Sequence, residues 1–347
     1  MNLKELAQNL GLSQTTVSRA LNGYPEVSEE TRRRVVLAAK QHNYRPNTRA
    51  KGLATGRAMA IGHVIPMATK HEMVNPIFAD FIAGAGETYA KAGYDMILSV
   101  VEDGDEPRIY RALKSRGTVD GVVLHGPRSV DRRMALLDEI GLTYAVHGRS
   151  TSYDAPYCWL DIDNENAFRR ATEFLLDLGH RRIALINGLE FMDFAQRRRG
   201  GFEAAFAARG LAADPGLMRA DEMTEDFGHD SATEMMLADA PPTAFLVSSI
   251  IAAMGVRRAI EDAGLKMGRD ISVITHDDAL SYFPNGRRGG RGRPIFTATR
   301  SSVRQAGRRL AELLLDRIES PGAPPGTELM EAELMVGGST GPAPNGV

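Results

Sequence analysis

The chain has 347 residues, of which 43% are hydrophobic and 25% are charged, and its formal net charge is −2. This length predicts two or three domains. No apolar run has the length of a membrane span, and the N-terminal residues show no signal-peptide pattern. Cys158 is the single cysteine, which excludes an intrachain disulfide and a cysteine-rich zinc site. We therefore expect a cytoplasmic protein without a membrane partner.

The small net charge hides a marked asymmetry along the chain. Residues 1–57 contain ten Lys and Arg against four acidic residues, a net charge of +6, so the remainder carries −8. A basic segment on an acidic body indicates a polyanionic partner for that segment alone.

The stretch 12–22 predicts a helix suited to the major groove of DNA. Ser13 is a good N-cap, and Val17 and Ala20 fall on one apolar face. Short amide, hydroxyl and guanidinium groups lie on the other face, and such groups match base edges. The residues of this polar face are Gln14, Thr15, Ser18, Arg19 and Asn22.

Flanking segments extend this helix into a small DNA-binding head over residues 1–46. A helix over 3–10 precedes it, and Gly11 lies where a left-handed residue ends a helix, which together give the helix-turn-helix pattern. A pair of surface helices in an all-α domain is the alternative for this segment alone. Ser28 predicts the start of a third helix that Pro46 ends. The residues expected to face the core are Val35, Val36, Ala39 and Tyr44.

Residues 47–57 predict either a short hinge helix or a plain linker. Asn47 can cap a helix in which Ala50 and Leu53 lie three residues apart on one side. Gly52 and Gly56 each weaken that helix by roughly 1 kcal/mol relative to Ala. So few residues cannot hold a helix alone in water. A segment that is helical only when docked would act as a hinge, and the spacing leaves both interpretations open.

From residue 58 onward, apolar strand runs alternate with amphipathic helices. We expect strands at 60–66, 94–101, 119–126, 144–148, 159–163, 181–188, 243–249 and 270–276. We expect helices at 75–91, 105–116, 130–140, 165–178, 194–209, 228–238 and 250–263. This βαβ alternation predicts an α/β fold with two parallel sheets covered by helices. Ligands of such sheets bind at the carboxyl ends of the strands, which here face each other across a cleft.

The last part of the chain is less regular. The Gly/Arg-rich segment 285–293 predicts a mobile surface loop, with a short RNA-binding tract as the alternative. A helix is expected at 302–318, a strand-like stretch at 328–338 and a disordered tail at 341–347. The body would then span 58–340, with lobe 1 at about 58–160 and 294–325 and lobe 2 at about 161–293 and 326–340.

Eight segments in the same order over nearly the whole chain resemble the LacI/GalR family of bacterial repressors. They are LKELAQNLGLSQTTVSRALNGYPEVSEETRRRV, NYRPNTRAKGLATGRAMAIG, NPIFADFIAG, DLGHRRIALING, RRRGGFEAAF, TAFLV, AMGVRRAIEDAGL and DISVITHDD. Within this family the chain looks most like regulators of sugar uptake of the α-glucoside (AglR-like) branch. The resemblance implies an N-terminal helix-turn-helix head, a hinge and a two-lobed body like that of periplasmic sugar-binding proteins.

The same resemblance implies a homodimer on palindromic double-stranded operator DNA. It places Gln14, Thr15 and Arg19 against bases. It places Thr16, Ser18, Asn22, Tyr44 and Asn47 on or near phosphates. Leu53 matches the family's wedge, which enters a central minor-groove step and bends the duplex, and Ala50 lies beside it.

For a small-molecule effector, the resemblance points to residues along the cleft. Arg198 matches the arginine that grips ligand hydroxyls, and a guanidinium suits vicinal diols. Asp277 of the HisAspAsp sequence matches the acceptor of the same set. Trp159 falls where the family often has an aromatic residue that stacks on a sugar ring. His125 and His147, at strand ends, align with polar cleft positions.

The sequence departs from the family pattern at three places. The Asn-Asp pair that usually follows the TAFLV strand is Ser249-Ile250, where Ser249 or its neighbour could cap the next helix. Thr275 and His276 replace a Gly and an aromatic residue, and Gly337 replaces an Arg. Ser249 and Ile250 leave the cleft fewer acceptors and more apolar wall, which favours a disaccharide or aryl glycoside over a free hexose.

The sequence does not favour an enzyme. GlyAlaGly at 84–86 lies inside a predicted helix and lacks the third Gly of a dinucleotide-binding loop. The eight His have no metal-ligand spacing, so no metal, cofactor or catalytic residue is expected. An architectural DNA-binding protein would leave the long body unexplained. We therefore expect a repressor controlled by a small-molecule effector, of which a carbohydrate such as an α-glucoside fits best. A non-sugar or phosphorylated effector, or none, is the alternative.

Overall fold

The computed structural model describes residues 1–21, 23–44, 56–66, 75–102, 104–286 and 292–344. It divides into two compact units, Met1–Met59 and Ala60–Val347.

The first unit is a head of three short helices. They are α1 (Leu3–Leu10), α2 (Gln14–Leu21) and α3 (Glu29–Gln41). Asn2 and Glu5 form a reciprocal capping box at the start of α1, and Gly11 ends α1 with a φ of 65°. The buried core consists of Leu6, Ala7, Val17, Ala20, Val27, Val35 and Ala39. The prediction that Val36 joins this core is wrong, because Val36 is 36% exposed on the outer side of α3.

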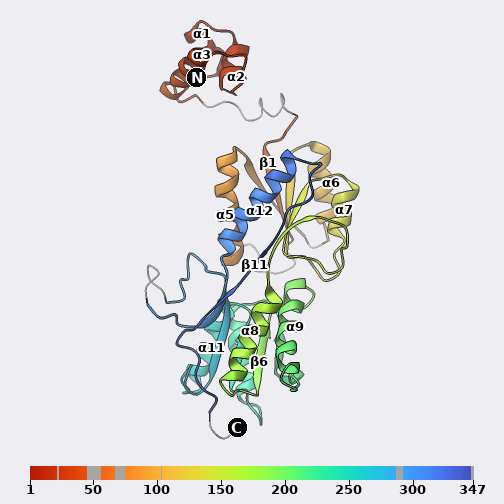
Figure 1. The fold of residues 1–347 in the computed structure, drawn as a ribbon, viewed down its shortest axis with the longest axis vertical. Coiled ribbons are helices and arrows are strands. Elements are labelled where there is room, and N and C mark those ends of the chain that lie inside the picture. The colour runs from red at the N-terminus through yellow and green to blue at the C-terminus, as the bar shows by residue number, and fades with distance from the viewer. Residues whose placement is uncertain (22, 45–55, 67–74, 103, 287–291, 345–347) are drawn as a thin grey trace. The chain divides into compact units, whose positions relative to one another are not determined.

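The second unit contains two lobes, each built on a twisted sheet. The first sheet has the strand order β11-β5-β4-β3-β1-β2, and all its pairings are parallel. Its strands are β1 (Ala60–Pro66), β2 (Asp95–Val101), β3 (Gly121–His125), β4 (Tyr144–His147), β5 (Cys158–Ile162) and β11 (Thr327–Met330). Figure 1 shows α5 (Pro76–Ala92) and α12 (Val303–Glu319) packed together, with α6 (Glu106–Arg116) and α7 (Arg133–Glu139) on another side of the lobe.

The second sheet has the order β12-β10-β9-β8-β6-β7. Its strands are β6 (Ile183–Asn187), β7 (Met218–Ala220), β8 (Ala244–Val247), β9 (Ser272–Asp277), β10 (Thr297–Arg300) and β12 (Glu333–Met335). Only β12 runs antiparallel to its neighbour among the described pairings. The helices of this lobe are α8 (Asn164–Asp177), α9 (Asp193–Ala207), α10 (Glu225–Met236) and α11 (Ile250–Asp262). Side chains of α8 and α9 pack on the sheet, and Phe168, Phe202 and Phe245 are fully buried.

The chain crosses between the lobes three times, and two of the predicted lobe boundaries are wrong. Residues 294–300 do not begin the return to lobe 1, because β10 pairs with β9 of lobe 2. Residues 327–330 do not belong to lobe 2, because β11 pairs with β5 of lobe 1. The single strand-like stretch expected at 328–338 is thus two strands in different sheets. The crossings follow β5, β10 and β11.

The end of the chain is anchored rather than disordered as far as residue 344. The Ala343 amide donates to the Leu178 carbonyl at 2.8 Å, and the Gly341 carbonyl lies 3.1 Å from His180 Nε2. The Gly/Arg-rich segment is described only at its ends. Asn285 is buried there and Arg293 donates to the Gly337 carbonyl at 2.9 Å. The prediction of a mobile loop over 287–291 falls outside the described residues.

Candidate functional site

The head presents a polar helix face. Gln14, Thr15 and Arg19 on α2 are exposed, whereas Val17 and Ala20 on the same helix are buried. This separation follows from helical spacing, because the buried pair packs on the head core. The Ser13 hydroxyl accepts from the Thr16 amide at 3.0 Å, so Ser13 caps α2.

The remaining DNA-contact predictions fall on less exposed or undescribed residues. Thr16 and Ser18 are half-buried, and the Thr16 hydroxyl lies 2.8 Å from the Ser13 hydroxyl. Tyr44 is half-buried against the head core, which agrees with its predicted packing role. Four predicted contacts lie outside the described residues: Asn22, Asn47, Ala50 and Leu53.

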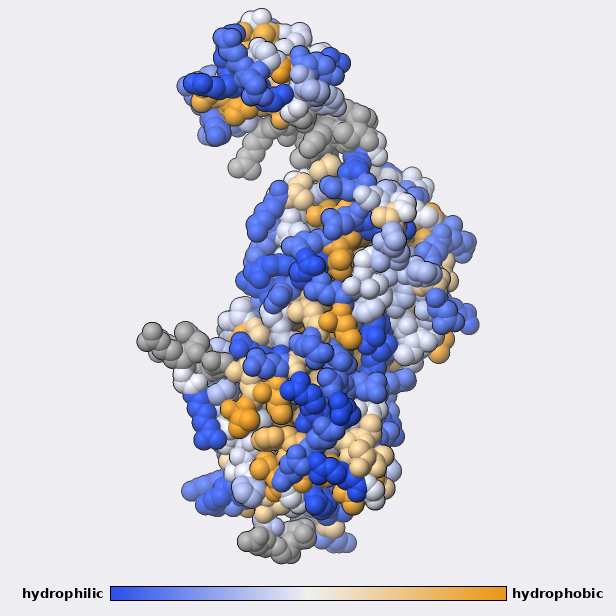
Figure 2. Space-filling view, in the orientation of Figure 1, coloured by the Kyte–Doolittle hydropathy of each residue, from blue (hydrophilic) through white to orange (hydrophobic). Residues whose placement is uncertain are grey.

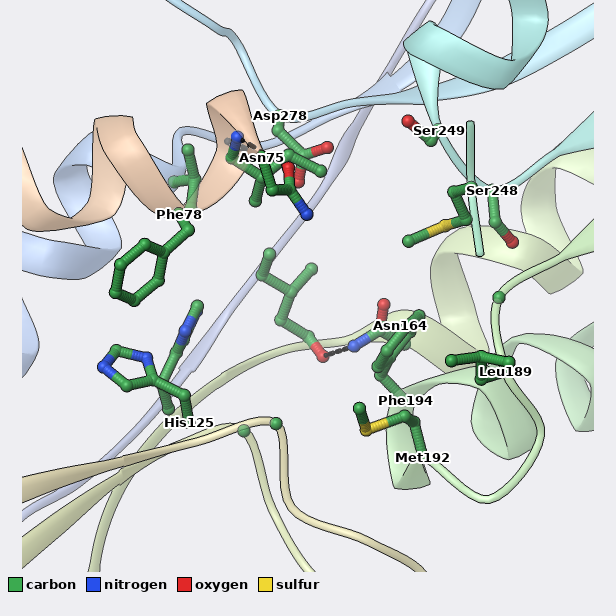
Figure 3. A pocket seen from close by; sticks show the side chains of 18 of the residues that line it. Asn75, Phe78, His125, Asn164, Leu189, Met192, Phe194, Ser248, Ser249 and Asp278 are labelled. Carbon is green, nitrogen blue, oxygen red and sulfur yellow. Dashed lines mark hydrogen bonds between the residues drawn. The ribbon is translucent and has the colours of Figure 1, made fainter. Parts of the chain in front are cut away.

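The body contains a cavity of about 450 Å³ between the two lobes, at the carboxyl ends of the parallel strands of both sheets. Its volume lies in the range of small-molecule sites, ~300–1,000 Å³. Apolar walls come from the start of α5, from the segment that leads into α9, from the residues before α10 and from the start of α11. The main apolar residues are Ile77, Phe78, Phe81, Leu189, Met192, Phe194, Met223 and Ile251. Figure 3 shows Asp278 and Asn75 close together on one side of this space, and Met192 and Phe194 together on another.

Arg198 lies in this cavity as the sequence predicts. It projects from α9, donates from Nε to Asn164 Oδ1 at 2.8 Å and from Nη1 to the Ser248 carbonyl at 2.6 Å. The rings of Phe168 and Phe194 lie 5.0 and 4.9 Å from its guanidinium carbon. Burial lowers the pKa of Arg198 to about 10, so the side chain stays charged at neutral pH. A guanidinium has five N–H donors, so donors remain for a ligand.

The carboxylate that reaches the cavity lies one residue beyond Asp277, where the sequence predicts an acceptor. Asp278 lines the cavity, whereas Asp277 does not. Asp277 instead accepts from the Ala279 amide at 2.9 Å and faces Asn285 and Arg300. Asp277 is the last residue of β9 and holds the following turn, so the next side chain reaches the cavity. Asp277, the residue named from the sequence, therefore does not reach the cavity, and Asp278 is the carboxylate at this strand end that does.

Trp159 does not line this cavity, so the predicted stacking platform there is also wrong. Its indole packs on the core of lobe 1, and the Arg149 guanidinium carbon lies 5.0 Å from the ring centroid. Trp159 lies near the start of β5, two residues short of Asp161, which does reach the cavity. Arg149 also donates to Asp161 at 3.0 Å and contributes to the cavity wall.

Three histidines form one end of the site. His125 and His147 line the cavity as predicted, and His63 lies fully buried with its Nδ1 3.0 Å from His125 Nε2. Burial lowers the pKa of His63 to about 3 and that of His147 to about 4, and lowers that of His125 well below its usual value. All three imidazoles are therefore neutral at physiological pH. His63 was not predicted, because a single His in an apolar strand carries no distinguishing pattern.

Comparison with known proteins decides the family. Residues 2–47 match the model described as bacterial regulatory proteins, lacI family, and residues 172–340 match the periplasmic binding protein-like domain. The chain is 45% identical over 345 residues to the HTH-type transcriptional regulator AglR of Rhizobium meliloti, which covers 99% of this chain and 96% of AglR.

The chain belongs to the LacI family of bacterial regulators.

Other LacI-family proteins extend this comparison. The chain is 32% identical to RafR of Escherichia coli over 278 residues, 80% of this chain and 82% of RafR. The solved CelR–cellobiose complex has a TM-score of 0.70 at 27% identity and covers 98% of this chain and 99% of its own. The Lac repressor bound to ONPG in the repressed state has a TM-score of 0.74 at 26% identity with the same coverage. The predicted fold class and AglR-like branch are confirmed, and the protein is a DNA-binding transcriptional regulator, not an enzyme.

Ser249 and Ile250, which replace the Asn-Asp pair usual in the LacI family, have different roles in the structure. Ser249 lines the cavity, and its hydroxyl accepts from the Ile251 amide at 3.2 Å, so it caps α11. Ile250 is buried away from the cavity, and Ile251 supplies apolar wall instead. Ser248 donates to Asn187 Oδ1 at 2.7 Å, while its carbonyl holds Arg198.

Several lining residues were missed by sequence reasoning. Asp161 lies within the strand predicted at 159–163, near its carboxyl end, and Asn164 directly follows that strand, which is the signal that could have identified them. Three acidic residues near the start of α10 had no such signal because no strand of usual length precedes them: Asp221, Glu222 and Glu225.

Within the described part of the chain, no helix is long and apolar enough to cross a membrane, and no group of three or more potential metal ligands occurs.

Proposed function

We propose that this regulator is a repressor that binds a palindromic operator as a homodimer. Its affinity for the operator rises or falls when a neutral carbohydrate occupies the body cavity. The observation that carries the proposal is the cavity of about 450 Å³, which combines apolar walls with Arg198, Asn164 and Asp278. A sugar ring offers both an apolar face and hydroxyls that donate and accept. The sequence resemblance to the α-glucoside branch of the family favours an α-glucoside, and the apolar wall at Ile251 favours a disaccharide.

The charges around the cavity support a neutral effector over a phosphorylated one. Carboxylates outnumber arginines among the described lining residues: Asp161, Asp221, Glu222, Glu225 and Asp278 against Arg149 and Arg198. Arg149 already pairs with Asp161, and Arg198 already donates to two groups. The buried histidines are neutral and add no positive charge. A phosphate placed here would face an excess of negative charge.

The exposed face of α2 supports the DNA-binding role of the head. We propose that Gln14, Thr15 and Arg19 contact bases and that Thr16 and Ser18 contact the backbone. The proposal extends to the undescribed Asn22, Asn47, Ala50 and Leu53, and to Tyr44, on the family resemblance.

An exposed apolar edge supports the homodimer. Strand β2 is an edge strand of the first sheet, and Leu98 and Val100 on it are 46% and 44% exposed. Exposed apolar residues on an edge strand favour burial against another chain.

The decisive experiment uses the full chain and a sugar panel. Thermal shift and calorimetry with maltose, trehalose, sucrose, cellobiose, glucose and glucose 6-phosphate would identify the effector class. Gel mobility of a palindromic operator fragment, with and without the bound sugar, would then show the direction of control. Binding of an α-linked disaccharide with a change in operator affinity is the expected result. Preferential binding of glucose 6-phosphate would contradict the proposal.

A further inference from the structure

A buried histidine lies directly next to the cavity carboxylate. His276 on β9 is fully buried, and its Nε2 is 3.5 Å from Asp278 Oδ1. Its Nδ1 is 3.1 Å from the Thr299 hydroxyl, and its Nε2 is 3.3 Å from the Ser301 hydroxyl. Both ring nitrogens therefore have polar partners, and the orientation of the imidazole is fixed. His276 itself does not line the cavity.

The partners of His276 belong to one of the crossings between the lobes. Thr299 lies on β10, and Ser301 lies between β10 and α12. The Ser301 amide donates to the Asp277 carbonyl at 3.0 Å, and the Val303 amide donates to the Asp278 carbonyl at 3.1 Å. The Asp278 backbone is thus held by the crossing segment, while its side chain faces the imidazole.

Charged and titratable groups face the Asp278 carboxylate from several elements. His276 faces it from β9, Arg198 from α9 and His147 from the end of β4. Burial raises the pKa of Asp278, but His276, Arg198 and His147 outweigh it, so the pKa lies below its usual value. Among the described residues, His276 is the one basic side chain with a nitrogen within 4.0 Å of this carboxylate.

We propose that His276 is a positioning residue that holds the Asp278 carboxylate toward the cavity, where the carboxylate accepts from an effector hydroxyl. This inference rests on the effector site proposed above. Arg198 does not hold the carboxylate directly, because none of its nitrogens lies within 4.0 Å of Asp278, and its Nε and Nη1 donate to Asn164 and Ser248. The imidazole thus fixes the place of the acceptor and contributes to keeping it charged. A charged acceptor forms stronger hydrogen bonds than a neutral one.

The first test measures maltose binding by calorimetry on the full chain. His276→Phe keeps a ring of similar size and removes both nitrogens. We expect maltose affinity to fall at least about tenfold at pH 7, with operator affinity in the absence of sugar unchanged. His276→Gln places an amide nitrogen near the former Nε2 and should restore part of the loss. If His276→Phe does not fold, maltose affinity is compared between His276→Gln and the wild type instead.

A matched control separates positioning from general packing. His180 in the same lobe is also buried and contacts the hydroxyls of Thr243 and Ser272 at 2.9 and 3.0 Å, but it does not line the cavity. His180→Phe should lower the Tm and leave maltose affinity unchanged. Equal losses of maltose affinity in both variants would overturn the proposal.

The second test needs no sugar and therefore separates this inference from the proposed function. The carboxyl carbon of Asp278, labelled with ¹³C and assigned with Asp278→Asn, is titrated by NMR. Loss of the imidazole should raise the pKa of Asp278 in His276→Phe. As the pH is lowered, Asp278 of His276→Phe should become protonated earlier. Maltose binding should therefore be lost at a higher pH in this variant than in the wild type. An unchanged carboxyl titration overturns the inference, whether or not the wild type binds maltose.

Discussion

Replacement of Arg198 by Ala gives the sharpest test of the effector site. The substitution removes the bonds to Asn164 Oδ1 and the Ser248 carbonyl and the contact with the Phe194 ring. It also removes the positive charge that lowers the pKa of Asp278. The cavity would keep its carboxylates and lose a cationic donor. We expect a repressor that still binds its operator and no longer responds to effector.

The size of the effect follows from the bonds that remain available to a ligand. A hydrogen bond to a charged group contributes roughly 1.5–3 kcal/mol. Loss of one such bond to a sugar hydroxyl lowers affinity by about 10- to 150-fold. Part of the cost falls on stability, because Asn164 and the Ser248 carbonyl lose a donor at a buried position. Water that enters the cavity can replace this donor, so the protein should remain folded.

The neighbouring Arg199 provides the control. It is on the same helix but is 39% exposed and pairs with Glu190 and Glu203 at the surface, where ion pairs contribute little. Arg199→Ala should therefore bind effector and operator like the wild type. Calorimetry with the active sugar and operator gel mobility would measure both variants. A normal effector response in Arg198→Ala would refute the site.

Three further predictions test other parts of the molecule. Arg19→Ala should weaken operator binding by about 1–3 kcal/mol per head and relax base preference; equal losses on cognate and scrambled DNA would show that Arg19 meets only phosphate. Asp278→Asn should lower sugar affinity in calorimetry while Asp277→Asn leaves it near the wild-type value, since only Asp278 lines the cavity; the reverse order would restore the original prediction. Leu6→Ala, in the centre of the head core, should destabilise the head by about 2–5 kcal/mol and abolish operator binding without loss of sugar binding; intact operator binding at 25 °C would show that the head tolerates the cavity.

Most of the fold could be predicted because its signals are local. Ser13, Ser28 and Gly11 mark helix ends through their own hydrogen bonds or backbone angles, and these signals need no tertiary information. The strands at 60–66 and 243–249 are apolar runs because parallel strands are buried on both faces. Local patterns of this kind give the two parallel sheets and the head.

The assignment of short strands to sheets is not local. β10 and β11 have four residues each, and their partners β9 and β5 lie at different distances along the chain. Apolar spacing indicates that such a segment is a strand, but the choice of neighbour depends on how the crossings pass between the lobes. The boundaries at 294 and 326 were therefore wrong although the strands lie close to them.

The same distinction explains the errors in the site. Arg198, His125 and His147 were placed correctly, since a residue on a long helix or at the carboxyl end of a central strand has a direction fixed by that element. Asp277 and Asp278 occupy the last position of a strand and the first position beyond it, where one bond to the Ala279 amide decides which carboxylate turns inward. A change of one residue at a strand end reverses the direction of the side chain. Adjacent acceptors at the ends of strands can therefore be ranked only once the hydrogen bonds of the turn are known.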